Sequence, residues 1–177
     1  NVQIVKDKYF PPLDETFGTF SDNQIDNAFC TYGDMLMDLL LQKVKPIVEE
    51  FTKLQLIETY SYARVYQTGN ELKRHVDRES CEVSATLNLG GDPWPIFIDG
   101  SGKENQPGTS YTLNSGDMLV YDGSKLEHWR EPFKGKLCGQ VFFHYNDLNS
   151  KLFKPHKYDG RDMLGLPPHY RKDRPND

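Results

Sequence analysis

The chain has 177 residues and carries 10 Phe, 10 Tyr and 2 Trp, which is enough apolar bulk for one domain with a sizeable core. A formal net charge of −5 gives no basic face for unspecific nucleic-acid binding, so we expect no nucleic-acid partner. No run of about 18 apolar residues is present, and the first residues lack the basic start and apolar core of a signal peptide. We therefore expect no membrane span and a cytoplasmic protein.

The first third of the chain indicates loop and helix. Residues 1 to about 25 are rich in loop-forming residues, including Pro11 and Pro12. Thr31 and Asp34 form a candidate capping pair at a helix start. Apolar residues then recur at helical spacing: Leu36, Leu39, Leu40, Val44, Ile47, Val48 and Phe51. Pro46 interrupts this pattern, so it either kinks the helix or begins a second one.

From about Ile57 the apolar period changes from helical to two residues. Residues 60–66 are aromatic and β-branched, and residues 81–89 alternate strictly between apolar and polar. Further short strands are predicted over 95–98, 109–113, 118–121, 126–130 and 136–145, with Gly, Pro, Asn and Asp between them. Helices followed by a run of strands favour a single domain, 1–177, made of helical support (1–56), a β-sandwich or barrel core (57–145) and a polar tail (146–177). We expect the tail to wrap the surface or to be partly disordered.

The three cysteines, Cys30, Cys81 and Cys138, are few and odd in number, and they show no C-x-x-C spacing. This usage fits a reduced protein better than a disulfide-stapled one. We expect each thiol to be buried as a small apolar group.

His75 and Asp77 stand two residues apart, so on an extended strand both side chains point to the same face. A third ligand from a distant strand would complete a set of two histidines and one carboxylate. His128 is the candidate, at the start of a late predicted strand. This set leaves coordination positions open and suits non-haem iron(II), which has to bind a cosubstrate and oxygen together.

Five segments in the order and spacing seen here resemble the 2-oxoglutarate dioxygenases, and among them the prolyl-4-hydroxylase-like group. The segments are 64–69, 72–78, 86–91, 115–121 and 127–136. The resemblance implies a double-stranded β-helix (jelly-roll) core, with iron(II) held by His75, Asp77 and His128 as the catalytic centre. It also implies 2-oxoglutarate and molecular oxygen as cosubstrates, succinate and carbon dioxide as co-products, and ascorbate as a candidate reductant.

The far carboxylate of 2-oxoglutarate would need a cation and a hydroxyl donor, because an unpaired buried carboxylate is costly. The family places Lys or Arg about ten residues after the second His, where this chain has Cys138. We favour Lys136, which follows a Gly as expected, over Arg130, which shares the inward face of His128 by the two-residue period. Tyr66 matches the family's hydroxyl donor.

The remaining candidates have weaker support. Arg78 and Glu82 are expected to form an ion pair, although they could line a substrate entrance, and Trp94 and Trp129 are expected to pack. His144 is expected to point away from the pocket, with a position facing it as the alternative, and the histidines of the tail, His156 and His169, are expected to be exposed.

The alternative to a hydroxylase is a cupin-like module that binds a metal or ligand without oxidising anything. For a hydroxylase, a peptidyl residue such as proline is the first substrate candidate and a free small molecule the second. The sequence does not decide the oligomeric state, since residues 35–51 could pack on the barrel or form a dimer face.

Overall fold

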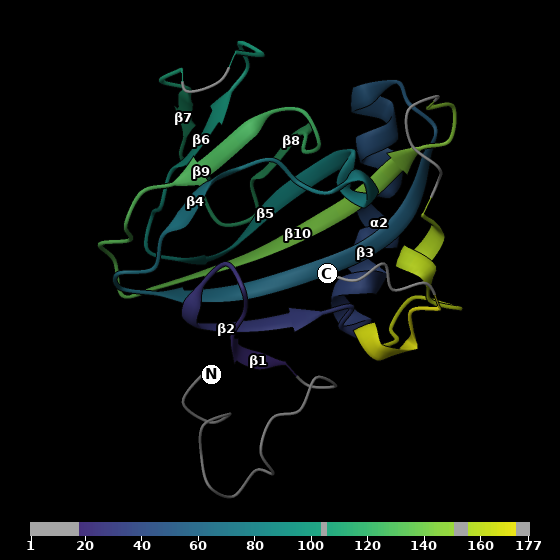
Figure 1. The fold of residues 1–177 in the computed structure, drawn as a ribbon, viewed down its shortest axis with the longest axis horizontal. Helices are drawn as coiled ribbons and strands as arrows, with labels where there is room; N and C mark the ends of the chain where they lie inside the picture. The colour runs from purple at the N-terminus through teal and green to yellow at the C-terminus, as the bar shows by residue number, and fades with distance from the viewer. Residues whose placement is uncertain (1–17, 104–105, 151–155, 173–177) are drawn as a thin grey trace, which may run out of the picture.

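The computed structural model describes residues 18–103, 106–150 and 156–172, which form two antiparallel sheets facing each other (Figure 1). The larger sheet has the strand order β1-β2-β3-β10-β5-β8, and the smaller one β4-β9-β6-β7. The larger sheet comprises β1 (Thr19–Ser21), β2 (Asp26–Tyr32), β3 (Leu56–Gln67), β5 (Val83–Gly91), β8 (Met118–Asp122) and β10 (Leu137–Asp147). The smaller one comprises β4 (Leu72–His75), β6 (Ile96–Asp99), β7 (Thr109–Tyr111) and β9 (Glu127–Arg130). This is the predicted double-stranded β-helix.

The strands β1 and β2 correct the prediction of loop and helix for this part of the chain. Both extend the larger sheet, where β2 pairs with β3. Thr31 lies in β2 opposite Ala63, so it does not take part in a helix cap. The β2 sequence, DNAFCTY, lacks the strict alternation of apolar and polar residues that marked residues 81–89. The predicted loop over residues 1–17 lies outside the described residues.

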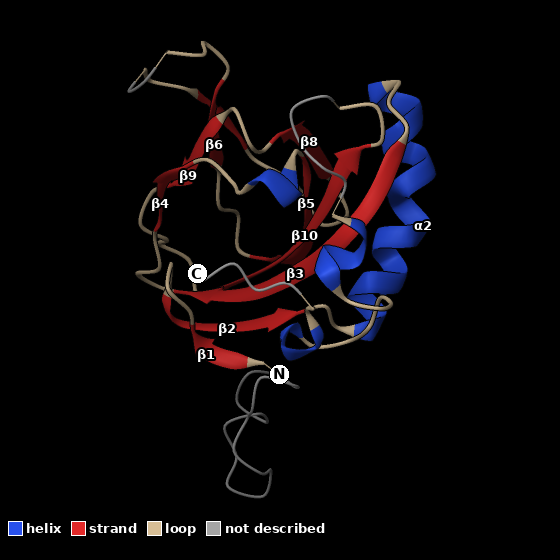
Figure 2. Cartoon of the chain, turned by 45° about the vertical axis from the view of Figure 1, so that its right-hand side comes forward, coloured by secondary structure: helices blue, strands red, loops and turns tan. Residues whose placement is uncertain are grey.

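The helix α2 (Met35–Thr52) packs against the outer face of the larger sheet, along β3 and β10 (Figure 2). Asp34 alone caps it, accepting hydrogen bonds from the N–H groups of the second and third helical residues at 3.0 and 3.2 Å. Pro46 lies inside this one helix and begins no second one, which answers the question left by the sequence. Within the described ranges α2 is the single α-helix, so one helix rather than several covers this face.

The larger sheet is buried on both faces. On the α2 side, Val141 and Phe143 of β10 cluster with Leu41 and Val48 of the helix. The alternate residues of β10, such as His144, face the smaller sheet instead. The space between the two sheets therefore holds polar groups such as His144 beside a second apolar cluster that includes Tyr66, Trp94 and Phe142. All three cysteines are buried and unpaired, as predicted.

The described part of the tail, 156–172, packs against the fold, where its first turn contacts β3. It contains two short 3-10 helices, η2 (Lys157–Gly160) and η3 (Pro168–Tyr170). Arg161 of this segment is buried and lies 3.0 Å from Asp38 of α2, which is also buried. The charged composition of the tail suggested that it is solvated, yet one of its charges, on Arg161, is paired inside the fold. No helix in the described ranges is both long and apolar enough to span a membrane.

Candidate metal centre and cavity

The structure brings His75, Asp77 and His128 together between the two sheets. His75 ends β4 and pairs in register with His128 of β9. The Nε2 atoms of the two histidines lie 3.6 and 3.5 Å from the Asp77 Oδ1 atom. One candidate ligand atom from each residue falls within 4.8 Å of the others. Two strands of the smaller sheet and the turn after β4 therefore place three metal-capable groups around one point.

Both histidines are oriented by backbone carbonyl groups. The His75 Nδ1 atom lies 2.8 Å from the Lys73 carbonyl oxygen, and the His128 Nδ1 atom lies 2.9 Å from that of Leu126. A carbonyl oxygen can only accept, so each Nδ1 carries the proton and each Nε2 keeps its lone pair. Such a partner on the far nitrogen is usual for metal-binding histidines.

Asp77 is held on its other oxygen. The Ser84 hydroxyl of β5 donates to Asp77 Oδ2 at 2.8 Å, and the Asp77 N–H donates to the Gly123 carbonyl oxygen at 2.8 Å. A Cβ atom on Gly123 would lie 2.5 Å from Asp77 Oδ2, so glycine leaves room for this approach. Burial acts to raise the pKa of Asp77, but the imidazole rings of His128 and His75 beside its carboxylate outweigh burial and hold the pKa well below its usual range. The carboxylate is therefore ionised and has Oδ1 directed at the histidines.

A second group of metal-capable residues shares Asp77 and adds Cys81 and His144. Burial raises the pKa of the Cys81 thiol to about 12, and burial lowers the pKa of His144 to about 4. The Ser84 hydroxyl already lies between Asp77 and His144, 3.0 Å from the His144 Nδ1 atom. A protonated thiol is a poor metal ligand, so the group with two histidines is the better metal centre.

A cavity of about 610 Å³ opens beside this centre. His75, Asp77 and His128 line it together with side chains of β2, β3 and β10 and of the C-terminal segment 156–172. His144 also lines the cavity, although the sequence analysis favoured a position away from it. Aromatic residues cover much of the wall: Tyr32, Tyr60, Tyr62, Tyr121 and Phe142.

The two candidate cations for 2-oxoglutarate lie in different surroundings. Lys136 is exposed just before β10 begins, and its backbone N–H donates to Asp92. Arg130 is 1% exposed and lies deep between the sheets. Its guanidinium donates to the Trp94 carbonyl oxygen and, at 3.4 Å, to Gln140 Oε1. Neither cation lines the cavity in this structure.

Arg130 is a buried cation with only neutral hydrogen-bond acceptors among the described residues. Its Nε atom is buried and has no hydrogen-bond partner there. Burial lowers the pKa of Arg130, although a guanidinium stays charged in proteins. Tyr66, fully buried, lies near both Arg130 and Arg64 and packs on Trp94 at 4.7 Å between ring centroids.

Other sequence predictions have mixed outcomes. Arg78 does not pair with Glu82, because its Nη2 atom donates to Asp159 of the tail at 2.6 Å. Trp94 packs on Phe133, and Trp129 stacks on Phe97 with ring centroids 5.4 Å apart, so both pack as predicted.

His156 is half-buried rather than exposed, and its backbone N–H donates to Asn146. The side chain of His169 lies outside the described residues.

The fold was compared with solved structures. HygX from Streptomyces hygroscopicus, solved with nickel and 2-oxoglutarate bound, is similar with a TM-score of 0.58 and 14% identity, covering 76% of this chain and 75% of that one. A 2OG-Fe(II) oxygenase family oxidoreductase from Burkholderia pseudomallei gives 0.55 and 11%, covering 68% of both chains. A prolyl-4-hydroxylase from Pseudomonas putida gives 0.51 and 14%, covering 75% of this chain and 78% of that one. At such identities the likeness shows a shared fold.

Sequence comparison adds no family assignment. No protein-family model matches the chain, and no curated protein matches it. The class that fold and site define together is a double-stranded β-helix protein with a His-x-Asp…His group between its sheets.

Proposed function

We propose that the protein is an iron(II)- and 2-oxoglutarate-dependent dioxygenase that hydroxylates a substrate C–H bond and releases succinate and carbon dioxide. The observation that carries the proposal is Arg130, a buried guanidinium without a carboxylate partner in the described ranges, two residues beyond His128 on the same inward face of β9. A dicarboxylate bound at the metal by one end would bring its other end to such a cation.

The charge of Arg130 makes an anionic ligand the simplest explanation of its position. Burying an unpaired charge costs several kcal/mol, even after the surrounding protein and water relax. Arg binds carboxylates through two parallel hydrogen bonds, and the unpartnered Nε offers one donor for such a fork. The Tyr66 hydroxyl, near Arg130, would be a second donor, as the sequence predicted.

The His75, Asp77 and His128 donor set fits iron(II), because two imidazole nitrogens and one carboxylate oxygen leave positions for cosubstrate and oxygen. When bound, iron(II) with 2-oxoglutarate and oxygen supplies the oxidising chemistry. The chain orients the ligand atoms through the Lys73 and Leu126 carbonyl groups and through Ser84. The aromatic cavity wall excludes water and positions the substrate.

The alternative, a cupin-like module that binds a metal without oxidation, gives no role to Arg130. Within the hydroxylase proposal, a peptidyl residue such as proline remains a predicted substrate, with a free small molecule as the second. Oxygen as cosubstrate and ascorbate as reductant belong to the proposal.

The test compares Arg130→Gln with Lys136→Gln. With iron(II) under nitrogen, we expect Arg130→Gln to raise the dissociation constant of 2-oxoglutarate by about 10-fold or more, since a hydrogen-bonded charge contributes roughly 1.5–3 kcal/mol. Lys136→Gln removes a charge that is exposed to solvent before β10 begins and should leave the constant unchanged. Calorimetric titration measures both, and thermal unfolding of each variant checks the fold.

Arg130→Lys separates a binding defect from a folding defect, because it keeps the charge and loses the fork. It should recover part of the affinity. If Lys136→Gln loses more affinity for 2-oxoglutarate than Arg130→Gln does, the proposal has assigned the cosubstrate to the wrong cation. If the wild type forms succinate and His128→Ala forms it equally fast, the metal centre itself is refuted.

A further inference from the structure

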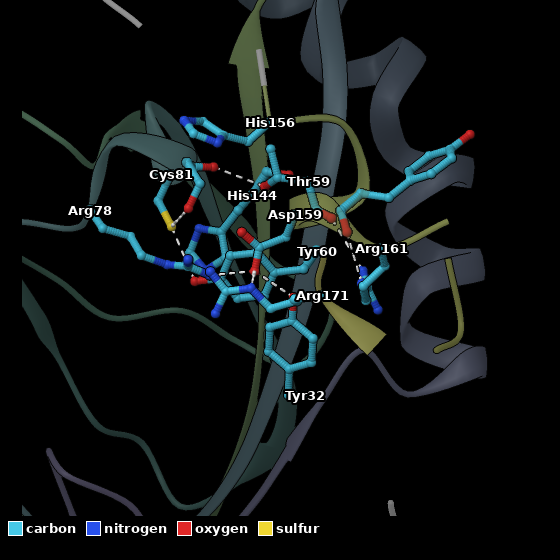
Figure 3. Close-up of polar contacts among 12 residues, drawn as sticks. Tyr32, Thr59, Tyr60, Arg78, Cys81, His144, His156, Asp159, Arg161 and Arg171 are labelled. Atoms are coloured by element: carbon cyan, nitrogen blue, oxygen red, sulfur yellow. Dashed lines mark hydrogen bonds and ion pairs between the residues drawn. The ribbon is translucent and has the colours of Figure 1, made fainter. Parts of the chain in front are cut away.

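The cavity is closed on one side by the C-terminal segment 156–172, which contributes Pro168 and Arg171 to its lining. Arg171 belongs to a group of four side chains centred on Asp159, which we call the Asp159 cluster (Figure 3). Asp159, 4% exposed, lies 2.6 Å from Arg78 Nη2 and 3.3 Å from Arg171 Nε, and it accepts a hydrogen bond from the Tyr32 hydroxyl. The cluster joins the tail to the residue that follows Asp77.

The Asp159 cluster has more positive than negative charge. Two guanidinium groups share one carboxylate, and burial, followed by the proximity of Asp159, raises the pKa of Tyr32, so this phenol stays neutral. Arg78 and Arg171 both face the cavity. The third cavity arginine, Arg64, is matched by Asp22. Beyond the metal group, the described cavity region thus holds one surplus positive charge.

The surplus positive charge is available to a ligand at Arg171. Its side chain is 10% exposed, and its buried Nε atom, although 3.3 Å from Asp159, is not aligned for a hydrogen bond with any described residue. A buried guanidinium with unused donors is a ready partner for a carboxylate or phosphate group.

An aromatic surface leads from the Asp159 cluster to the metal centre. Tyr32 and Tyr60 stack at 4.8 Å between centroids with an angle of 21°, and Tyr60 lies 4.6 Å from the ring of His144. His144 contacts Ser84, which holds Asp77. Because both tyrosines line the cavity, an apolar group beside this stack would extend from the arginines toward His75 and Asp77.

We propose that the substrate is a small molecule with an anionic group, which Arg78 and Arg171 bind while its body lies along Tyr32 and Tyr60. This inference rests on the proposed function and names the substrate class of the same site. The cavity volume of about 610 Å³ suits a small molecule, because such sites span roughly 300–1,000 Å³.

The experiment uses a pair of probes that differ in charge and hardly in shape, phenylacetate and phenylacetamide. Each is titrated into the full chain loaded with zinc(II) and 2-oxoglutarate, so that no turnover occurs and Arg130 is already occupied. Ligand-observed NMR gives the two dissociation constants. We expect the carboxylate to bind about 10-fold more tightly than the amide, as a charged hydrogen bond implies.

Arg171→Gln should abolish this preference, whereas Arg171→Lys, which keeps the charge, should retain much of it. Lys172→Gln is the matched control, because Lys172 is exposed and pairs with Asp162 away from the cavity. Equal binding of the two probes, or a preference that survives Arg171→Gln, would overturn the inference. Failure of 2-oxoglutarate to bind would instead refute the proposed function, and the effect of Arg171 on the probes would still be measurable.

Discussion

Ser84 is the residue on which the orientation of Asp77 depends most directly. Its hydroxyl donates to the Asp77 oxygen that faces away from the histidines and also contacts His144. We expect Ser84→Ala to weaken binding of iron(II) or zinc(II) about 10-fold, because loss of a group that orients a metal ligand lowers metal affinity by roughly 10- to 100-fold. Competition with a chromophoric chelator measures this affinity. Ser110→Ala, on the exposed strand β7, is the control, and equal affinities of the two variants would contradict the role of Ser84.

At the same scale, local spacing brings the metal candidates together but leaves the choice of cosubstrate cation open. His75 and Asp77 need only two residues of extended chain to share a face. The choice between Lys136 and Arg130 depended on where the last strand begins. Because β10 begins at Leu137, Lys136 stays outside the sheet, while Arg130 keeps the inward face of β9. At that boundary the backbone N–H of Lys136 donates to Asp92, 44 positions away in sequence.

At the scale of elements, one buried ion pair fastens the C-terminal segment to the helix. Arg161 and Asp38 are 0% and 1% exposed, and Asp38 also accepts from the Ser61 hydroxyl and from the Gly165 N–H. Removing one partner of a buried pair leaves an uncompensated charge. Arg161→Gln should therefore lower the free energy of unfolding by about 3–5 kcal/mol, measured by urea titration.

The matched control for Arg161→Gln is Lys172→Gln in the same segment. Lys172 and Asp162 are each 66% exposed, and an exposed pair contributes about 0–1 kcal/mol. A loss below about 1 kcal/mol in Arg161→Gln, similar to the control, would mean that the segment does not depend on this pair.

The pairing of Asp38 with Arg161 could not be predicted from the sequence. Asp38 lies in the predicted helix and Arg161 in the predicted tail, 123 positions apart, and neither residue shows a local sign of its partner. Strand β5 gives a second case. Its alternation was read correctly as a strand, yet Ser84 and Thr86 are as buried as Ala85, because α2 covers one face of the sheet and the smaller sheet covers the other.

At the scale of the whole molecule, the space between the sheets holds a buried titratable group, His144, and the stability of the fold should therefore respond to pH. Burial holds the pKa of His144 at about 4, below its ordinary value of 6.5. Between these values the unfolded chain binds a proton that the folded protein does not. The free energy of unfolding should therefore fall as the pH falls from about 6.5 to 4, with full stability from this group above 6.5. The shift amounts to about 3 kcal/mol.

His144→Gln tests this assignment, because it removes the titrating group and keeps a polar side chain beside Ser84. The substitution itself lowers stability at pH 7.5, so the informative quantity is the difference between the variant and the wild type across pH. Urea titrations of the metal-free protein between pH 7.5 and 4 should show this difference shrinking as the pH falls, since only the wild type loses the contribution of His144. A constant difference over that range would place the acid sensitivity of the fold in other groups.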